Sequence, residues 1–149
     1  MNVIESSVVI NQPVEDVFAY YTDLENETQW RIGVLELETT SEGPIGVGTT
    51  TREVTQFLGR RIENTAVVIE YEPNKVVAME TTSGPIPFKF RVTFDPIESG
   101  TWMTVRASGE VGGFFKLAEP LVIRMGKRQM ETELNNLKDL IEVRAETGG

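Results

Sequence analysis

The chain has 149 residues and a net charge of -9, and it contains neither cysteine nor histidine. Disulfide frameworks, zinc fingers, thiol nucleophiles, Ser-His-Asp triads and histidine-ligated iron are excluded, because each needs an absent residue type. Acid-base chemistry would have to use carboxylates, Lys, Tyr, Arg or bound water. The negative charge disfavours nucleic acid and anionic lipid as partners, since phosphate groups repel it.

Length and hydropathy favour one soluble domain over residues 1–149, with a frayed tail from about residue 144 to 149. No stretch reaches the roughly 18 consecutive apolar residues of a membrane span. Met1 to Glu5 lacks the basic and apolar regions of a signal peptide. We therefore expect a cytoplasmic protein with no stable membrane insertion, no cofactor and no metal. The sequence leaves the oligomeric state open.

The first thirty residues predict a strand followed by two short helices. Residues 3–10 alternate between two faces, and the run ends at Asn11-Gln12-Pro13. Pro13 suits the first turn of a helix, and apolar residues then recur with helical spacing as far as Tyr21. Asp23 is a candidate cap for a second short helix that leads to Trp30.

Residues 33–111 predict an antiparallel meander of six strands. Turn residues recur about every ten positions, with alternating apolar and polar side chains between them. One face of such a sheet needs cover. The expected strands are Leu35–Glu38, Thr49–Phe57, Ile62–Tyr71, Lys75–Ser83, Phe88–Asp95 and Trp102–Val111.

Residues 119–143 predict one long amphipathic helix that supplies this cover. A meander of this size curls because strands twist, and we expect the helix to lie across its concave face. The predicted fold class is therefore α+β, a curved antiparallel sheet of about seven strands wrapped on a long C-terminal helix. The apolar stripe of that helix should comprise Pro120, Ile123, Lys127, Met130, Leu134, Leu137 and Ile141.

Several segments, in the right order along nearly the whole chain, carry a resemblance to a known family. They are FAYYTDLENETQWRIGV (18–34), GPIGVGTTTR (43–52), EYEP (70–73), FDP (94–96) and ELNNLKDLIE (133–142). The chain resembles the polyketide cyclase/dehydrase-like branch of the START/SRPBCC superfamily, which shares its helix-grip fold with the birch pollen allergen. The resemblance implies a hydrophobic cavity between sheet and helix. Relatives use this cavity to bind lipids, sterols, hormones or polyketide intermediates, and sometimes for chemistry.

The candidate ligand-binding residues are those expected to line this cavity. Alternatively, they interdigitate as an ordinary core, and Trp30 attaches the second helix to the sheet. Methionine favours an adaptable pocket. The candidates are Trp30, Phe57, Phe88, Phe90, Met103, Val105, Ile123, Lys127, Met130 and Leu134.

Lys127 is the polar residue on the predicted apolar stripe. It could pair with a carboxylate or enolate oxygen of a ligand, act in catalysis if desolvated, or extend to the rim with its stem on apolar surface. Arg124 and Arg128 lie beside it, whereas residues 1–42 carry nine acids and one base, Arg31. The basic cluster is expected to pair with that acidic segment, to meet an anionic ligand, or simply to be solvated.

Our first functional hypothesis is a binding or carrier protein for a hydrophobic small molecule, of lipid, aromatic or polyketide-like character. The alternative is a polyketide cyclase or dehydratase-type enzyme that uses Lys, Glu or Tyr in the same cavity. A cavity packed solid would favour a protein-interaction module. Residues 112–115 are either an entry gate or a connector. The strand candidates for catalysis, each more at home on the outer face, are Glu53, Glu63, Glu80, Arg52 and Tyr71.

Overall fold

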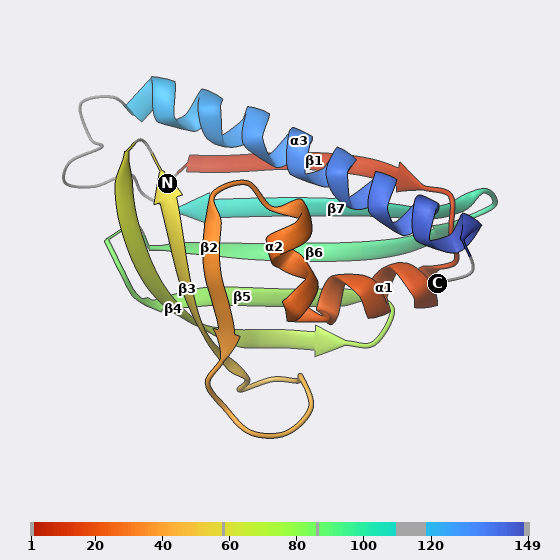
Figure 1. Cartoon of the computed structure of the whole chain (residues 1–149), viewed down its shortest axis with the longest axis horizontal. Coiled ribbons are helices and arrows are strands. Elements are labelled where there is room, and N and C mark those ends of the chain that lie inside the picture. Colours follow the sequence, from red (N-terminus) through yellow and green to blue (C-terminus); the bar gives the residue numbers. More distant parts are fainter. Residues whose placement is uncertain (1, 58, 86, 110–118, 148–149) are drawn as a thin grey trace.

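The computed structural model describes residues 2–57, 59–85, 87–109 and 119–147 and shows a curled sheet gripping one long helix (Figure 1). The predicted order of elements is confirmed. The elements are β1 (Asn2–Ile10), α1 (Val14–Thr22), the 3-10 turn η1 (Leu24–Asn26), α2 (Glu27–Trp30), β2 (Val34–Thr39), β3 (Thr50–Phe57), β4 (Arg60–Glu72), β5 (Val76–Ser83), β6 (Phe88–Ile97), β7 (Gly100–Gly109) and α3 (Glu119–Glu146).

The seven strands form one antiparallel sheet in the order β1-β7-β6-β5-β4-β3-β2. Strands β2 to β7 form the expected meander, and the last of them, β7, pairs with β1 at the edge of the sheet. Register shifts interrupt the pairing of β2 with β3 and of β4 with β5. Such irregularities increase strand twist, which suits a sheet that bends around a helix. The α+β helix-grip prediction is confirmed.

The packed core lies where α1 and the C-terminal half of α3 meet the sheet. The ring centroid of Phe18 on α1 lies 5.1 Å from that of Phe94 on β6, and Tyr21 lies 5.6 Å from the same ring. Met103 and Leu137 are fully buried beside them. Amphipathic α1 thus uses its apolar face to close one end of the curled sheet.

The predicted apolar stripe of α3 is confirmed in its second half and wrong in its first. Leu134, Leu137 and Ile141 are buried, whereas Pro120 and Lys127 are exposed. The inward positions near the start are Val122, which is buried, and Gly126, where an added Cβ would lie 3.4 Å from Ile4 Cδ1 of β1. With 3.6 residues per turn, spacing back from Leu134 fits position 126 or 127, and close packing on β1 selects the glycine.

The C-terminal end of α3 also differs from expectation. Helix α3 continues to Glu146, past the predicted end at residue 143, because the next glycines come only at 148 and 149. The last strand is described as far as Gly109. Within the described ranges, no helix combines the length and the apolar character that a membrane crossing requires.

Candidate functional site

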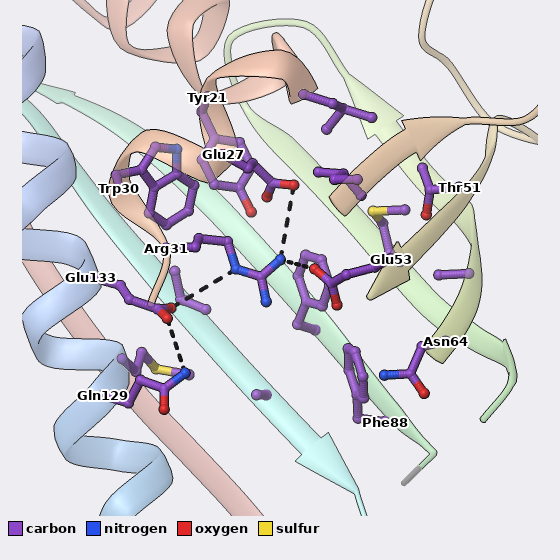
Figure 2. A pocket seen from close by; sticks show the side chains of 18 of the residues that line it. Tyr21, Glu27, Trp30, Arg31, Thr51, Glu53, Asn64, Phe88, Gln129 and Glu133 are labelled. Carbon is purple, nitrogen blue, oxygen red and sulfur yellow. Dashed lines mark hydrogen bonds and ion pairs between the residues drawn. The ribbon is translucent and has the colours of Figure 1, made fainter. Parts of the chain in front are cut away.

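A cavity of about 190 Å³ lies between the concave face of the sheet and the N-terminal half of α3 (Figure 2). It is partly open to solvent. Its wall comes from α1, η1, α2, six of the strands and α3, so segments distant in sequence meet there. The lining residues are Tyr21, Leu24, Glu27, Trp30, Arg31, Leu37, Thr51, Glu53, Asn64, Ala66, Met79, Phe88, Phe90, Val105, Ala107, Gly126, Gln129, Met130, Glu133 and Leu134.

One part of the wall is apolar. Phe88 and Phe90 alternate inward along β6, and their rings stack with centroids 5.9 Å apart. Val105 and Ala107 face the cavity from β7, and Met130 does so from α3. The small side chain of Ala107 and the absent one of Gly126 leave space that larger residues would fill. This side of the cavity can therefore make favourable contacts only with the apolar part of a ligand.

The opposite part of the wall is charged. Arg31, just after α2, donates a hydrogen bond to Glu53 of β3. Arg31 Nη1 also lies 3.9 Å from Glu27 Oε2, and Arg31 Nε lies 4.0 Å from Glu133 Oε1 of α3. We call these four residues the Arg31 cluster. Figure 2 shows the three carboxylates converging on one guanidinium from three different elements.

Backbone contacts hold Arg31 in place. Gly33 has φ +78°, and a Cβ there would lie 2.7 Å from Gln56 O of β3, so this close turn needs glycine. Gln56 N donates to Gly33 O at 2.8 Å. From the other side, Ile32 N donates to Glu133 Oε2 at 2.9 Å. The segment carrying Arg31 is therefore fastened to both β3 and α3.

Two carboxyl groups of the Arg31 cluster, those of Glu27 and Glu133, have raised pKa values. Burial raises the pKa of Glu27 to about 7, because desolvation outweighs the stabilising charge of Arg31. Burial likewise raises the pKa of Glu133, although Arg31 and the hydrogen bonds from Ile32 and Gln129 act against the rise. Desolvation also raises the pKa of Tyr21, which is neutral at physiological pH. A carboxyl group that titrates near neutrality can exchange protons with a bound molecule.

Burial and charge oppose each other at Arg31 itself. Desolvation lowers its pKa, but the carboxylates of Glu53, Glu27 and Glu133 raise it by more, so the guanidinium stays charged. In the described part of the chain, no group of three or more acidic residues has an arrangement that could hold a metal ion. The Arg31 cluster is thus an ion-pair network with more negative than positive charge.

Six of the predicted ligand-binding residues line the cavity: Trp30, Phe88, Phe90, Val105, Met130 and Leu134. Met103 instead lies fully buried in the packed core, and Ile123 is half-buried outside the lining set. Lys127 is exposed, so its expected place on the inner stripe is wrong. The side chain of Phe57 and residues 112–115 fall outside the described parts. Ligand contact by any of these residues stays a prediction.

Trp30 lines the cavity and also packs against neighbouring helices. It is buried, it lines the cavity, and its ring packs on Tyr21 of α1 with centroids 5.7 Å apart. Asn136 Nδ2 of α3 donates to Trp30 O at 3.3 Å. Trp30 therefore joins α2 to its neighbours and also contributes an aromatic face to the site.

The strand candidates for catalysis divide between the two faces of the sheet. Glu53 was expected on the outer face, and this is wrong: it is 9% exposed and lines the cavity opposite its partner Asn64. Glu63 lies outside, where its Oε1 is 2.8 Å from Arg52 Nε. Outside too, Glu80 Oε2 lies 3.6 Å from Lys89 Nζ. The ring of Tyr71 packs on Phe18 in the core.

Sequence reasoning missed most of the polar wall, including Glu27, Arg31, Asn64 and Glu133. Arg31 did leave a signal, because it is the single base within the acidic residues 1–42. A lone base among acids is a natural centre for ion pairs. Among the described residues, the basic side chains of Arg124, Lys127 and Arg128 make no ion pair with the acidic residues 1–42. The base that pairs within this segment is Arg31, with Glu27.

Comparisons with solved structures agree with the geometry. A protein from Thermus thermophilus superposes with a TM-score of 0.84 at 20% identity, covering 95% of this chain and 98% of its own. The Zhui aromatase/cyclase from Streptomyces sp. R1128 gives 0.84 at 15% identity over 99% and 98%. A START superfamily protein from Mycobacterium smegmatis gives 0.77 at 15% identity over 94% and 97%. At these identities the likeness shows the fold.

The sequence itself gives the family. A comparison with curated proteins found no significant match. The profile of the family described as "Polyketide cyclase / dehydrase and lipid transport" matches residues 1–142, almost the whole chain. This confirms the resemblance drawn from the sequence segments. The chain belongs to the polyketide cyclase / dehydrase and lipid transport family.

Proposed function

We propose that this protein binds an apolar small molecule in the cavity between sheet and α3, as a binding or carrier protein. The observation that carries the proposal is the cavity itself, a hollow of about 190 Å³ whose apolar wall faces a cluster of charged side chains. A few polar groups set in a mainly apolar wall are typical of small-molecule sites. Membership of a family described by lipid transport and polyketide cyclisation supports the same reading.

The volume limits the size of the ligand. An engineered apolar cavity of about 150 Å³ in another protein accommodates benzene, whereas drug-sized ligands occupy about 300–1,000 Å³. The cavity of about 190 Å³ therefore suits a single ring or a compact two-ring molecule. A longer chain would have to extend through the open side.

Binding of indole, an apolar two-ring molecule, tests the proposal. Ligand that binds only the folded protein raises the unfolding midpoint, by about 3 °C at a tenfold excess over Kd. The variant Ala107→Leu fills the cavity from β7 and should abolish this shift. Its control is Ser108→Leu, one residue along on the outer face of β7, which should retain it. An equal shift in both variants would place indole elsewhere and contradict the proposal.

The second candidate function is a cyclase or dehydratase-type enzyme. The observation in its favour is Glu27, a buried carboxyl group in the cavity wall with a pKa of about 7. As its carboxylate, such a group could take the proton from the carbon next to the ketone. As the acid, it could then return that proton to the leaving hydroxyl, so that water and the conjugated C=C bond form and the carboxylate is regenerated. Elimination of water from 4-hydroxy-4-phenylbutan-2-one, followed by absorbance of the conjugated ketone, tests this. Catalysis predicts a rate that depends on a group titrating near pH 7 and is lost in Glu27→Gln. A rate equal to the uncatalysed one would exclude this role for the substrate tested.

A further inference from the structure

The charged part of the cavity has an unequal number of acids and bases. Among the described lining residues, Glu27, Glu53 and Glu133 are acidic and Arg31 is the one base. When all four are ionised, the Arg31 cluster has two negative charges in excess. A ligand carboxylate placed there would meet net repulsion, which a partly buried site screens poorly.

Arg31 offers little attraction to an anionic ligand. Its guanidinium already donates to Glu53 and lies about 4 Å from oxygens of Glu27 and Glu133. An incoming anion would have to compete with these three carboxylates for the same N–H groups. Glu27, in contrast to Arg31, is short of partners. It is 7% exposed, and within the described residues its carboxyl group accepts no hydrogen bond. Its only charged neighbour at ion-pair distance there is Arg31, at 3.9 Å. This carboxyl therefore lacks a donor at hydrogen-bond distance.

Asn64 supplies a second observation that does not depend on the acids. It lines the cavity from β4, is 7% exposed, and its amide makes no hydrogen bond to any described residue. A buried polar atom without a partner costs free energy, so such groups are normally satisfied. Figure 2 places Asn64 beside Glu53 and Phe88, at the border between the charged and the apolar wall. The unpartnered atom, Asn64 Oδ1, lies against Gly84, and a half-turn of the amide would present this acceptor to a donor at that border.

We propose that the ligand is a small aryl or alkyl amine, bound as its ammonium ion, with its N–H groups on Glu27 and Glu133 and its apolar part against Phe88 and Phe90. An ammonium ion supplies the positive charge that the Arg31 cluster lacks and up to three donors for its unpaired oxygens. Its hydrocarbon part fits the single-ring volume of the cavity. The inference rests on the proposed binding function and adds the chemical class of the ligand.

Three probes of nearly equal size test the charge of the ligand: 2-phenylethylammonium, 2-phenylethanol and 3-phenylpropionate. Calorimetric titration of the whole protein at pH 8 should give an affinity for the ammonium at least about tenfold above that for the carboxylate, with the alcohol between them. Equal affinities, or a preference for the carboxylate, would overturn the inference while leaving the binding function in place. Binding of none of the three would contradict both.

Two glutamates close together on α3 provide a matched pair of variants. Glu133→Gln removes a charge from the Arg31 cluster and keeps an oxygen for the Ile32 N–H, so it should fold and lose most of the ammonium preference. Glu131→Gln changes an exposed residue and should keep that preference. The same loss in both variants would attribute the preference to the overall charge of the protein and overturn the inference.

The pH dependence of the wild-type protein gives a second readout that needs no variant. The groups that face Glu27 are Tyr21 of α1, Arg31 after α2, Glu53 of β3 and Glu133 of α3. As pH falls from 8 to 6, Glu27 takes up a proton, and affinity for 2-phenylethylammonium should fall several-fold while that for 2-phenylethanol stays constant. An ammonium affinity that rises or stays level over this range would contradict the inference.

Discussion

The two ends of the space between the sheet and α3 are built from the same elements but packed differently. At the end covered by α1, each element contributes a side chain that is at most 2% exposed: Phe94 from β6, Met103 from β7 and Leu137 from α3. Towards the start of α3, the same three elements contribute half-buried residues that line a cavity: Phe90, Val105 and Met130.

Small residues account for part of the difference. Rings from α1 fill the first end, which we call the packed end, where Phe18 and Tyr21 both contact Phe94. At the second end, the hollow end, Ala107 and Gly126 stand where larger side chains would close the space. The same amphipathic pattern along β6 thus forms part of a packed core at one end and part of a cavity wall at the other. On β6 itself both ends carry phenylalanine, and the ends differ there in exposure: Phe94 is buried and Phe90 is half-buried.

The largest effect should come from truncating the packed end. Phe94→Ala removes a buried ring contacted by two others, and the cavity that it leaves should cost about 3–5 kcal/mol in the free energy of unfolding. Phe90→Ala enlarges a space that already exists and should cost less than about 2 kcal/mol. Urea denaturation measures both. Equal losses would remove the distinction between the two ends.

The next effect should come from Arg31→Met. Without the guanidinium, three carboxylates remain close together, which should cost about 2–4 kcal/mol at pH 8. The pKa values of Glu27 and Glu133 would rise further above their unfolded values, so the folded state gains protons and stability as pH falls. Urea denaturation at pH 8 and pH 5 should therefore show the deficit shrinking on acidification. A deficit that is independent of pH would contradict the charge account.

A smaller effect of opposite sign is expected for Glu27→Gln. The pKa of Glu27 rises from 4.5 to about 7, so between these values the folded protein retains a proton that the unfolded chain has lost. Wild-type stability from this group is full below pH 4.5 and declines as pH rises through 7. The variant lacks this decline and should be about 1–3 kcal/mol more stable at pH 8, with the difference vanishing near pH 4.5. Thermal unfolding across this range measures it.

The smallest effect should come from Lys127→Ala. Because Lys127 is exposed on α3, its loss should change the free energy of unfolding by less than about 0.5 kcal/mol and leave indole binding intact. Gly126→Ala, one residue earlier, serves as the contrast because position 126 lines the cavity and faces β1. A strong loss of indole affinity in Lys127→Ala would restore the site predicted from the sequence.

The fold could be predicted from the sequence because period-two strands, turn residues and a long amphipathic helix are local signals. The inward side of β6 was equally clear, since Phe88, Phe90, Val92 and Phe94 alternate with polar residues. The division into a packed and a hollow end could not be predicted, because it depends on how far α1 reaches across the sheet. The sequence pattern is the same at both ends.

The charged wall of the cavity was harder to predict for a different reason. Glu53 lies on a strand that has polar residues on both of its faces, such as Thr51 and Arg52, so the side of the sheet that it faces cannot be read from alternation alone. Lys127 and Gly126 differ by one helical position, which a stripe of 3.6-residue spacing does not resolve. Arg31 follows a short helix, and contacts with Gln56 and Glu133 over long sequence separations determine where it points.

The central claim is that the hollow end, and not the packed end, binds a small apolar molecule. NMR of methionine methyl groups labelled with carbon-13, titrated with indole, tests it directly. Met79 and Met130 line the cavity, Met103 lies in the packed core and Met125 is exposed. Saturable shifts of the Met79 and Met130 signals, with Met103 and Met125 unchanged, are the predicted result. Shifts confined to Met125, or no shift at Met79 and Met130, would contradict the account.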